Sequence, residues 1–403
     1  MNTRIFSLVL SAVVCGAASG CGDDAEQSQS PQVQAGAPAS ADAGVKLDFS
    51  RFDKALTDAI EAYNTEHSAT PLAGASAVIV HEKLGTVHSH GYGEFAEDRL
   101  FLIASSSKIL SAGVLMRLAD QGKLDVDAPI GQYLGDWGKT KASQITAAQL
   151  VSNSSGLPSL SEVSGAANDP KSPFTSNLCQ YTDAGSLRDC GKVLYSTEPP
   201  RAPDSMFAYG GSQWQLAGAV AEVVSGKAWA ELIDETYVKP CEVASLGFTN
   251  QFGSSGGLGY PAFFKADRAN LPETKNPSIE GGAFVNAQDY GKLLLMHLRG
   301  GRCGDKRVLS EAATARMQKN RIKEYGGTTG SPAQPGYGLG FWTNESGKVI
   351  TDGGAYGSFP LLDLERRYGI FIVIESTSEV GGQLGNKVKP VVDSIFDDAK
   401  LSK

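Results

Sequence analysis

Positive charge is scarce in this sequence and is nowhere concentrated. Its 403 residues include 36 lysines and arginines against 44 aspartates and glutamates, which gives a net charge of −8 and an isoelectric point near 5.3. Such a chain has too little basic surface to neutralise a phosphate backbone, so we expect no nucleic-acid partner. Metal-ligand spacings are also missing, because His88 and His90 share a strand face with no third ligand nearby in the sequence. We expect neither a metal nor another cofactor.

Long hydrophobic runs are absent too. The apolar stretch at residues 5–14 is too short to span a bilayer and follows Arg4, as is typical of a signal peptide. The segment ASGC that ends at Cys21 resembles the lipobox of bacterial lipoproteins. That resemblance implies cleavage before Cys21 and lipidation of its thiol, and an ordinary secretory signal is the alternative.

Residues 22–45 hold almost nothing to bury and consist mainly of Asp, Glu, Gln, Ser, Pro, Ala and Gly. This composition predicts a disordered tether. We therefore expect a signal peptide at 1–20, a lipidated Cys21 with its tether at 21–47, and one folded domain at 48–400. The layout predicts an exported protein that lipid anchors to a bacterial membrane, on its periplasmic or cell-surface side.

Four cysteines lie in the expected domain, and an even number in an exported protein favours two disulfides. Four cysteines allow three pairings. The simplest pairs Cys179 with Cys190, which closes a polar loop, and leaves Cys241 with Cys303. Buried free thiols are the alternative.

The apolar pattern predicts strands near both ends of the domain and helices between them. Two stretches rich in Gly, Ser, Pro and Asn, 159–203 and 250–277, are expected to be long loops. Strands from both chain ends can form one antiparallel sheet flanked by helices, with a mostly helical subdomain inserted, which is an α+β fold. The expected helices are 49–67, 109–120, 208–224, 287–298 and 387–398, and the expected strands are 74–81, 86–92, 339–343, 348–351, 357–364 and 369–375.

Ser105 begins the only S-x-x-K motif of the chain, which ends at Lys108. Three residues make about one helical turn, so the two side chains share a face at the start of a predicted helix. A serine hydroxyl needs a nearby base to act as a nucleophile, and a desolvated lysine can be or tune that base. The alternative is an N-cap serine followed by an exposed lysine.

A rival serine motif, G-x-S-x-G, occupies residues 253–257. The nucleophile elbow of an α/β-hydrolase requires a strand before this motif and a helix after it. Its surroundings here are loop-like, so we expect no elbow at Ser255.

Several segments, taken together, are quite specific in their number, order and spacing. They are FLIASSSK at 101–108, ADQGKLDVD at 119–127, LVSNSSGLP at 150–158, MFAY at 206–209 and YGLGFW at 337–342. With these segments, residues 49–398 resemble the serine β-lactamase and penicillin-binding-protein superfamily, and most of all the class C β-lactamases with their esterase and D-peptidase relatives.

The resemblance implies a role for each matching residue. Ser105 would be the acylated nucleophile, Lys108 would hold the proton network, and Tyr209 would act as base with Lys108. A phenol with a pKa near 10 can act as a base only where a cation stabilises the phenolate. The backbone N–H groups of Ser105 and Ala355 would form the oxyanion hole. A half-buried structural aromatic is the alternative for Tyr209.

The chain also departs from the family pattern around the substrate. Gly211 stands where the family has the Asn of Tyr-x-Asn, and Asn153 stands where a His is usual. Asp352-Gly353-Gly354 replaces a motif of Lys or His, a small residue and Gly, so an anion takes the place of a cation that binds a substrate carboxylate. We expect Asp352 to repel such a carboxylate; the alternative is that it only caps the turn at Gly353 and Gly354.

These observations predict a monomeric serine hydrolase that acts through an acyl-enzyme on a small ester, amide or peptide. Esterase-type hydrolysis of neutral substrates is the main hypothesis. A β-lactamase, a D,D-carboxypeptidase or a D-aminopeptidase is the second. The third, from another class, is a degenerate binding or regulatory module with the same fold.

Overall fold

The computed structural model describes residues 47–255 and 259–401. The predicted signal peptide, Cys21 and the tether up to residue 46 lie outside the described residues. In the described part, no helix combines the length and the apolar character that crossing a membrane requires.

A seven-stranded antiparallel sheet joins the two ends of the domain, in the order β2-β1-β12-β11-β10-β9-β8. β1 pairs with β12 so that Val78 lies opposite Phe371. This arrangement confirms the predicted α+β fold. The strands are β1 (Gly74–His81), β2 (Gly85–Gly93), β8 (Gly336–Tyr337), β9 (Trp342–Thr343), β10 (Val349–Thr351), β11 (Ser358–Asp363) and β12 (Tyr368–Val373).

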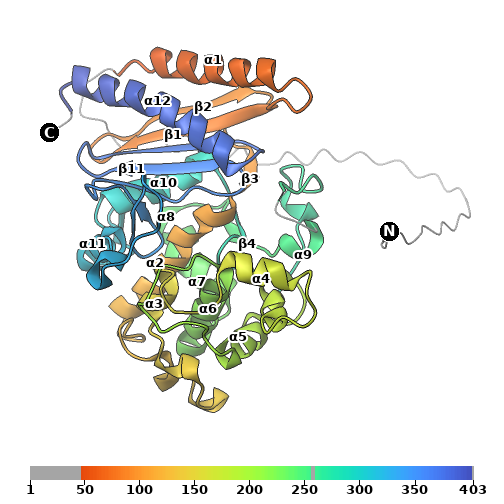
Figure 1. Ribbon diagram of the computed structural model, residues 1–403. Coiled ribbons are helices and arrows are strands. Elements are labelled where there is room, and N and C mark those ends of the chain that lie inside the picture. The colour runs from red at the N-terminus through yellow and green to blue at the C-terminus, as the bar shows by residue number, and fades with distance from the viewer. Residues whose placement is uncertain (1–46, 256–258, 402–403) are drawn as a thin grey trace, which may run out of the picture. The chain divides into compact units, whose positions relative to one another are not determined.

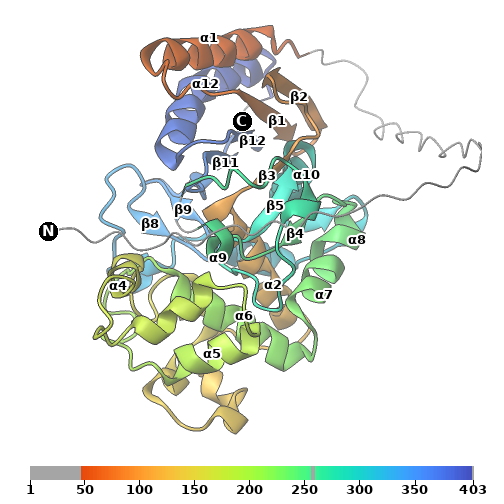
Figure 2. The same ribbon diagram turned by 90° about the vertical axis from the view of Figure 1, so that its right-hand side faces the viewer.

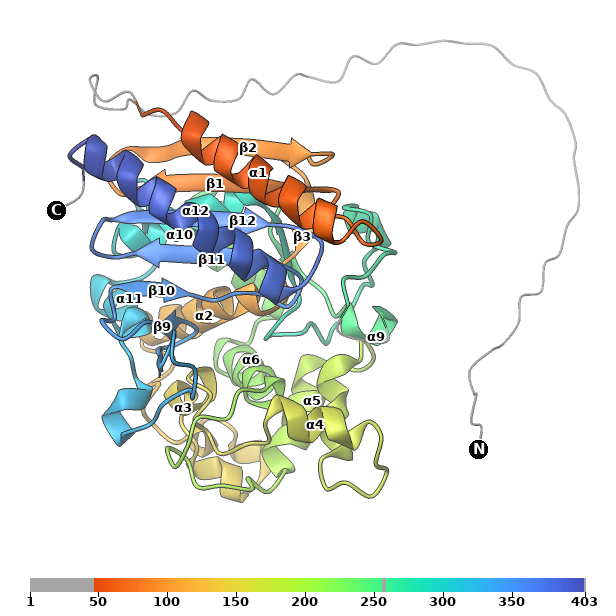
Figure 3. The same ribbon diagram turned by 45° about the horizontal axis from the view of Figure 1, so that its top comes forward.

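Both faces of the sheet are covered, as the fully buried pattern of β1 requires. Ala77 and Ile79 face a core shared with α1 (Ser50–Glu66) and α12 (Ser378–Asp398). Val78 and Val80 point the other way, into the core that contains α10 (Ala287–Leu298). Figures 1 and 3 show α1 and α12 side by side across one face of the sheet.

The segment between the two groups of strands forms the mostly helical part of the fold, with α4 to α7 gathered away from the sheet (Figure 2). The short strands β3, β5 and β4 pair here in that order, and β6 pairs with β7. The elements are β3 (Leu100–Leu102), α2 (Lys108–Asp120), α3 (Ala147–Val151), α4 (Leu160–Ala166), α5 (Leu187–Ser196), α6 (Gly211–Ser225), α7 (Trp229–Ile233), α8 (Lys239–Cys241), β4 (Gly247–Phe248), α9 (Phe252–Ser255), β5 (Ala283–Asn286), β6 (Arg302–Cys303), β7 (Lys306–Arg307) and α11 (Glu311–Gln318).

The expectation of a long loop at 159–203 is wrong, because α4 and α5 lie within it. Both helices begin with a serine N-cap, Ser159 before α4 and Ser186 before α5, whose side chain accepts a backbone N–H of the first turn. Polar composition therefore marks helix starts here rather than a loop.

Helix α12 begins at Ser378, nine residues before the expected start at 387. Thr377 caps it by accepting the Val380 N–H. Its first half contains Gly381 and Gly385, which weaken a helical pattern in sequence but allow close packing. A Cβ on Gly385 would lie 2.2 Å from the Phe359 ring of β11, so the sheet requires that glycine.

Both predicted disulfides are present. Cys179 pairs with Cys190 across a Cα separation of 5.6 Å, and Cys241 pairs with Cys303 across 5.0 Å. The first joins α5 to the 3-10 helix at Thr175–Tyr181, and the second joins α8 to β6. The alternative of free thiols is therefore wrong for these four cysteines.

Candidate active site

A strained turn presents Ser105 between β3 and α2. Ala104 has a φ of 44°, a left-handed conformation that is uncommon for residues other than glycine. Ser106 Oγ donates to the Asp352 carbonyl at 2.6 Å, and Ser107 Oγ donates to the Ala104 carbonyl at 2.6 Å. These buried hydroxyls hold the turn in place and so orient Ser105.

Lys108 follows Ser105 by one turn, and its side chain is fully buried. Lys108 Nζ donates to Ser105 Oγ at 3.1 Å and to the Glu280 carbonyl at 3.0 Å. The structure thus brings together the two ends of the S-x-x-K motif. Lys108 is not the exposed lysine of the alternative interpretation.

Tyr209 reaches the same hydroxyl from the loop before α6. Its OH donates to Ser105 Oγ at 2.7 Å, and its ring centroid lies 4.7 Å from Lys108 Nζ. Trp342 of β9 packs against the Tyr209 ring, with centroids 5.5 Å apart. Lys108 and Tyr209, from two distant parts of the sequence, therefore both bind the hydroxyl oxygen of Ser105.

These groups change one another's protonation. Burial opposes a charge on Lys108, but the neighbouring Tyr209 and Glu280 outweigh it, and the pKa of Lys108 is raised. Burial also raises the pKa of Tyr209, and the Lys108 ammonium opposes that rise. At neutral pH Lys108 is an ammonium and Tyr209 a phenol, and a phenolate at Tyr209 depends on Lys108 for stabilisation.

Glu280 belongs to this cluster although no sequence motif indicates it. Its Oε2 lies 3.3 Å from Lys108 Nζ, and its side chain is only 10% exposed. It lies in the loop before β5, far in sequence from the other members. The one available signal is Gly211, because a glycine inside the tyrosine motif leaves space that another segment must fill.

Asp352 does not face the pocket, which corrects the expectation that it meets the substrate. Its side chain is fully buried, and neither carboxyl oxygen has a hydrogen-bond partner in the described part of the chain. Its neighbours Thr351 and Gly353 line the pocket, so strand alternation turns Asp352 inward. Burial raises its pKa well above the ordinary value, against the Lys108 ammonium. Asp352 therefore lies outside the pocket lining and, in the described chain, makes no hydrogen bond that would cap the following turn.

Gly353 and Gly354 differ in what they do. Gly353 lines the pocket. Gly354 is packed against the strand that leads to the nucleophile, and a Cβ there would lie 2.1 Å from the Ile103 carbonyl. The second glycine thus allows the segment after β10 to approach the turn that carries Ser105.

Asn153 lies outside the pocket lining and contacts the first turn of α6 instead. This position corrects its assignment to substrate binding. Its side chain is fully buried, and its Oδ1 accepts from Gln213 Nε2 at 3.0 Å and from Trp214 Nε1 at 3.1 Å. Its φ of 55° suits Asn better than most residues. Asn153 therefore fixes the start of α6, where Tyr209 enters the site.

A pocket of about 530 Å³ opens beside Ser105. Ala355 belongs to its lining. Among the residues that the structure describes, Lys389 is the one charged residue of this lining, and the others are neutral. The described residues contain no group of three or more His, Cys, Asp or Glu that could hold a metal ion. The other lining residues are Leu160, Tyr209, Ala333, Gln334, Trp342, Asn344, Val349, Thr351, Gly353, Phe359, Leu361, Ser378, Gly382 and Asn386.

The rival motif at 253–257 lies partly outside the described residues. Its described part falls in α9, a four-residue helix from Phe252 to Ser255. A nucleophile elbow needs its serine between a strand and a helix, and here the described part of the motif is itself helical.

Known proteins share this architecture. The chain is 22% identical to protein flp of Staphylococcus aureus over 328 residues, which is 76% of this chain, and it spans 60% of the length of that relative. The solved structure of EstCE1, a hydrolase with promiscuous acyltransferase activity, matches with a TM-score of 0.66 at 17% identity, over 85% of this chain and 100% of EstCE1. A D-stereospecific amidohydrolase from Streptomyces matches with a TM-score of 0.56 at 21% identity, over 82% of this chain and 97% of that one. At such identities the structural matches show the fold.

The family model for β-lactamase matches residues 57–389. This range contains Ser105, Lys108, Tyr209 and Glu280. Because the match covers most of the chain, this protein belongs to the β-lactamase family.

Proposed function

We propose that this protein is a serine hydrolase that works through an acyl-enzyme on Ser105. The observation that carries the proposal is that Ser105 Oγ accepts hydrogen bonds from both Lys108 Nζ and Tyr209 OH, at 3.1 and 2.7 Å. A hydroxyl that meets a buried ammonium and a phenol has the partners that serine activation requires.

The proposed reaction has two halves. The reactive form is the one in which Tyr209 has released its proton to solvent and is a phenolate that the Lys108 ammonium stabilises. Ser105 Oγ then attacks the substrate carbonyl while its proton passes to this phenolate. The tetrahedral intermediate then expels an alcohol or amine, which takes the proton from Tyr209. In the second half a water molecule gives its proton to Tyr209 and attacks the acyl carbon. The bond from the acyl carbon to Ser105 Oγ then breaks, Ser105 Oγ takes the proton back from Tyr209, and the carboxylic acid leaves.

The backbone N–H groups of Ser105 and Ala355 are the proposed oxyanion hole. Both residues line the pocket, and within the described chain neither N–H has a protein acceptor. Preorganised donors of this kind contribute about 3–4 kcal/mol to transition-state stabilisation.

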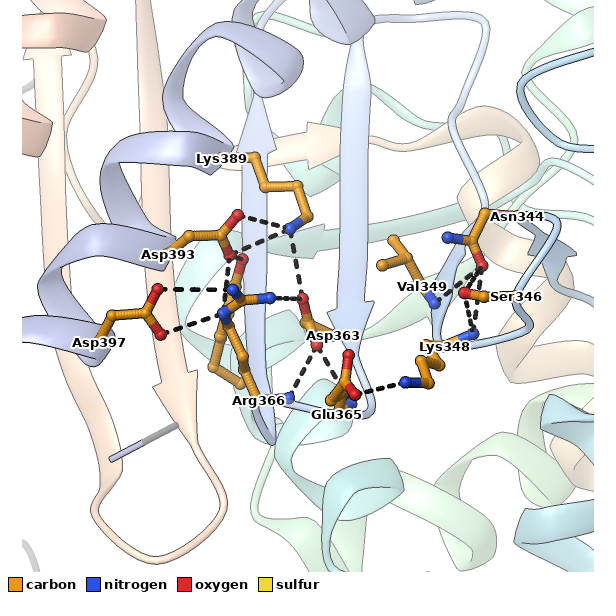
Figure 4. Close-up of polar contacts among 11 residues, drawn as sticks. Asn344, Ser346, Lys348, Val349, Asp363, Glu365, Arg366, Lys389, Asp393 and Asp397 are labelled. Carbon is orange, nitrogen blue, oxygen red and sulfur yellow. Dashed lines mark hydrogen bonds and ion pairs between the residues drawn. The ribbon is translucent and has the colours of Figure 1, made fainter. Parts of the chain in front are cut away.

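We further propose that the preferred substrates are neutral esters. The support is the charge of the pocket lining, not Asp352. Lys389 is its one charged side chain among the described residues, and its Nζ is already bound by Asp393 at 2.9 Å and Asp363 at 3.3 Å. Figure 4 shows Lys389 between these two carboxylates, with Arg366 beside them. A substrate carboxylate thus finds no unpaired cation in the described lining.

The test is labelling with an activated ester, followed by mass spectrometry. We expect a single acyl adduct on Ser105 in the wild type and none in Ser105→Ala, which should remain folded. Hydrolysis rates for a neutral ester, a β-lactam and a D-amino-acid peptide then rank the substrate classes. An adduct elsewhere, or none, would favour a degenerate binding module.

We also propose, from the sequence alone, that Cys21 is lipidated and anchors the protein to a bacterial membrane. The wild type should fractionate with membranes, and Cys21→Ser should release it into the soluble exported fraction. A soluble wild type would contradict the anchor and leave the hydrolase proposal untouched.

A further inference from the structure

Gly211 is not required by its own backbone. It begins α6, and its φ lies outside the left-handed region that favours glycine. Space is the constraint instead: a Cβ on Gly211 would lie 2.0 Å from Glu280 Oε1 and 2.3 Å from Gln180 Oε1. The Glu280 carboxylate therefore occupies the volume that a side chain at position 211 would need.

The segment that carries Glu280 is held on both sides. The backbone carbonyl of Ile279 accepts from Ser111 Oγ of α2 at 2.7 Å, and its N–H donates to Gln215 Oε1 of α6 at 3.1 Å. Gly282 approaches so closely that a Cβ there would lie 2.0 Å from the Thr249 carbonyl. The position of Glu280 relative to α2 and α6 is thus fixed by the fold.

Glu280 contacts Lys108 twice, through its carbonyl at 3.0 Å and through its carboxylate at 3.3 Å. We propose that Glu280 is a positioning residue that keeps Lys108 a charged ammonium beside Ser105, using the space that Gly211 leaves free. This inference rests on the proposed acyl-enzyme function. In this proposal the negative charge of Glu280 balances the positive charge of Lys108, and Glu280 contacts the lysine but not Ser105.

The ionisable groups around this pair come from separate elements. Lys108 lies on α2, Tyr209 before α6, and Asp352 after β10, while Tyr181 lies beside Glu280 and has its pKa raised first by burial and then by that carboxylate. Glu280 acts in the same direction on its neighbours, since its charge raises the pKa of both Lys108 and Tyr209. Removing this charge should lower both pKa values.

Glu280→Gln keeps the shape of the side chain and removes its charge. In a profile of Ser105 labelling rate against pH, the acidic limb reports Tyr209 and the alkaline limb reports Lys108. We expect both limbs to move to lower pH. A purely structural role would lower the rate at every pH without moving the limbs. Glu198→Gln, in an exposed pair with Lys141, makes the same change in net charge and should leave the profile in place.

Gly211→Ala tests the geometry. Glu280 Oε1 is the mobile end of a side chain, so the new methyl group should push it away from Lys108 and reproduce the shift seen in Glu280→Gln. A background of Glu280→Ala with Gln180→Ala removes both side chains that a Cβ at position 211 would meet. In that background Gly211→Ala should add almost nothing further, and additive losses there would overturn the claim that position 211 lacks a side chain because Glu280 needs the space.

A readout independent of activity separates this inference from the proposed function. NMR of protein labelled with ¹³C at lysine Cε, with Lys108 assigned by Lys108→Arg, follows its titration directly. Lys108 should titrate at lower pH in Glu280→Gln than in the wild type. Identical titration in both proteins would overturn the role of Glu280, whereas an unlabelled Ser105 with a shifted Lys108 would overturn only the hydrolase.

Discussion

At the scale of single residues, two buried aspartates, Asp352 directly after β10 and Asp363 at the end of β11, show that hydrogen-bond partners decide what burial of a carboxyl costs. Asp363 accepts from the Arg366 N–H at 2.8 Å and from Lys389 Nζ at 3.3 Å. Asp352 has no hydrogen-bond partner for either oxygen in the described chain. A buried carboxyl without such partners favours its neutral form, because desolvation penalises the charge.

Asp352→Asn should therefore stabilise the protein at neutral pH. The raised pKa means that folded Asp352 holds its proton more tightly than the unfolded chain, whose pKa is about 3.8. Its contribution to the free energy of unfolding is complete below that value and is lost as pH rises. Urea unfolding at pH 4 and pH 8 should show a larger gain for the variant at pH 8.

Asp363→Asn is the matched control. It should destabilise the fold by about 1–3 kcal/mol, because the charged partners lose their acceptor. Equal effects of the two substitutions would contradict the assignment of Asp352 as an uncompensated carboxyl.

Lys108→Ala and Tyr209→Phe should each slow acylation of Ser105 by about 10²-fold or more. Both remove parts of one proton path, so the double variant should be little slower than the slower single variant. Single-turnover acylation kinetics measure this. Multiplicative losses would argue against a shared path.

At the scale of elements, two glycines of helix α12 differ in the space that surrounds them. Gly385 faces the sheet, where Phe359 leaves no room for a Cβ, whereas a Cβ on Gly382 meets nothing within 4 Å. Both glycines have helical backbones, so the difference between them is packing alone.

This difference predicts opposite effects in one helix. Gly385→Ala should cost about 1–3 kcal/mol through overpacking against Phe359. Gly382→Ala should stabilise by up to about 1 kcal/mol, because alanine restricts the unfolded chain and favours the helix. Chemical denaturation of the two variants measures both values. A loss in both would mean that α12 packs differently.

At the scale of the whole molecule, strands from the two ends of the domain pair with each other in one sheet. Pairing of β1 with β12 joins strands almost 300 positions apart in sequence, from Ser76↔Val373 to His81↔Tyr368. Such long-range pairing carries a large entropic cost in folding. The two disulfides lie in the inserted helical part and restrict that segment of the unfolded chain.

The disulfides should contribute unequally. In the chain-entropy relation, the separation of 11 residues for Cys179–Cys190 corresponds to about 3 kcal/mol. The separation of 62 for Cys241–Cys303 corresponds to about 4 kcal/mol. Urea unfolding of paired Cys→Ser variants should show a smaller loss in the free energy of unfolding for Cys179–Cys190 than for Cys241–Cys303. Free thiols at these positions, after denaturation without reductant, would contradict both bonds.

The sequence by itself determined the features that local chemistry encodes. The S-x-x-K spacing placed Ser105 and Lys108 on one face, and periodicity located α10 at Ala287–Leu298 and β1 at Gly74–His81. The resemblance singled out Tyr209, whose OH donates to Ser105 Oγ, because a motif keeps its register. Tertiary structure alone decided the rest. Strand alternation beside the pocket turned Asp352 inward, and the hydrogen bonds of α6 made Asn153 structural. Glu280 joined the site because folding places its loop against Gly211, a contact between distant segments that no local pattern encodes.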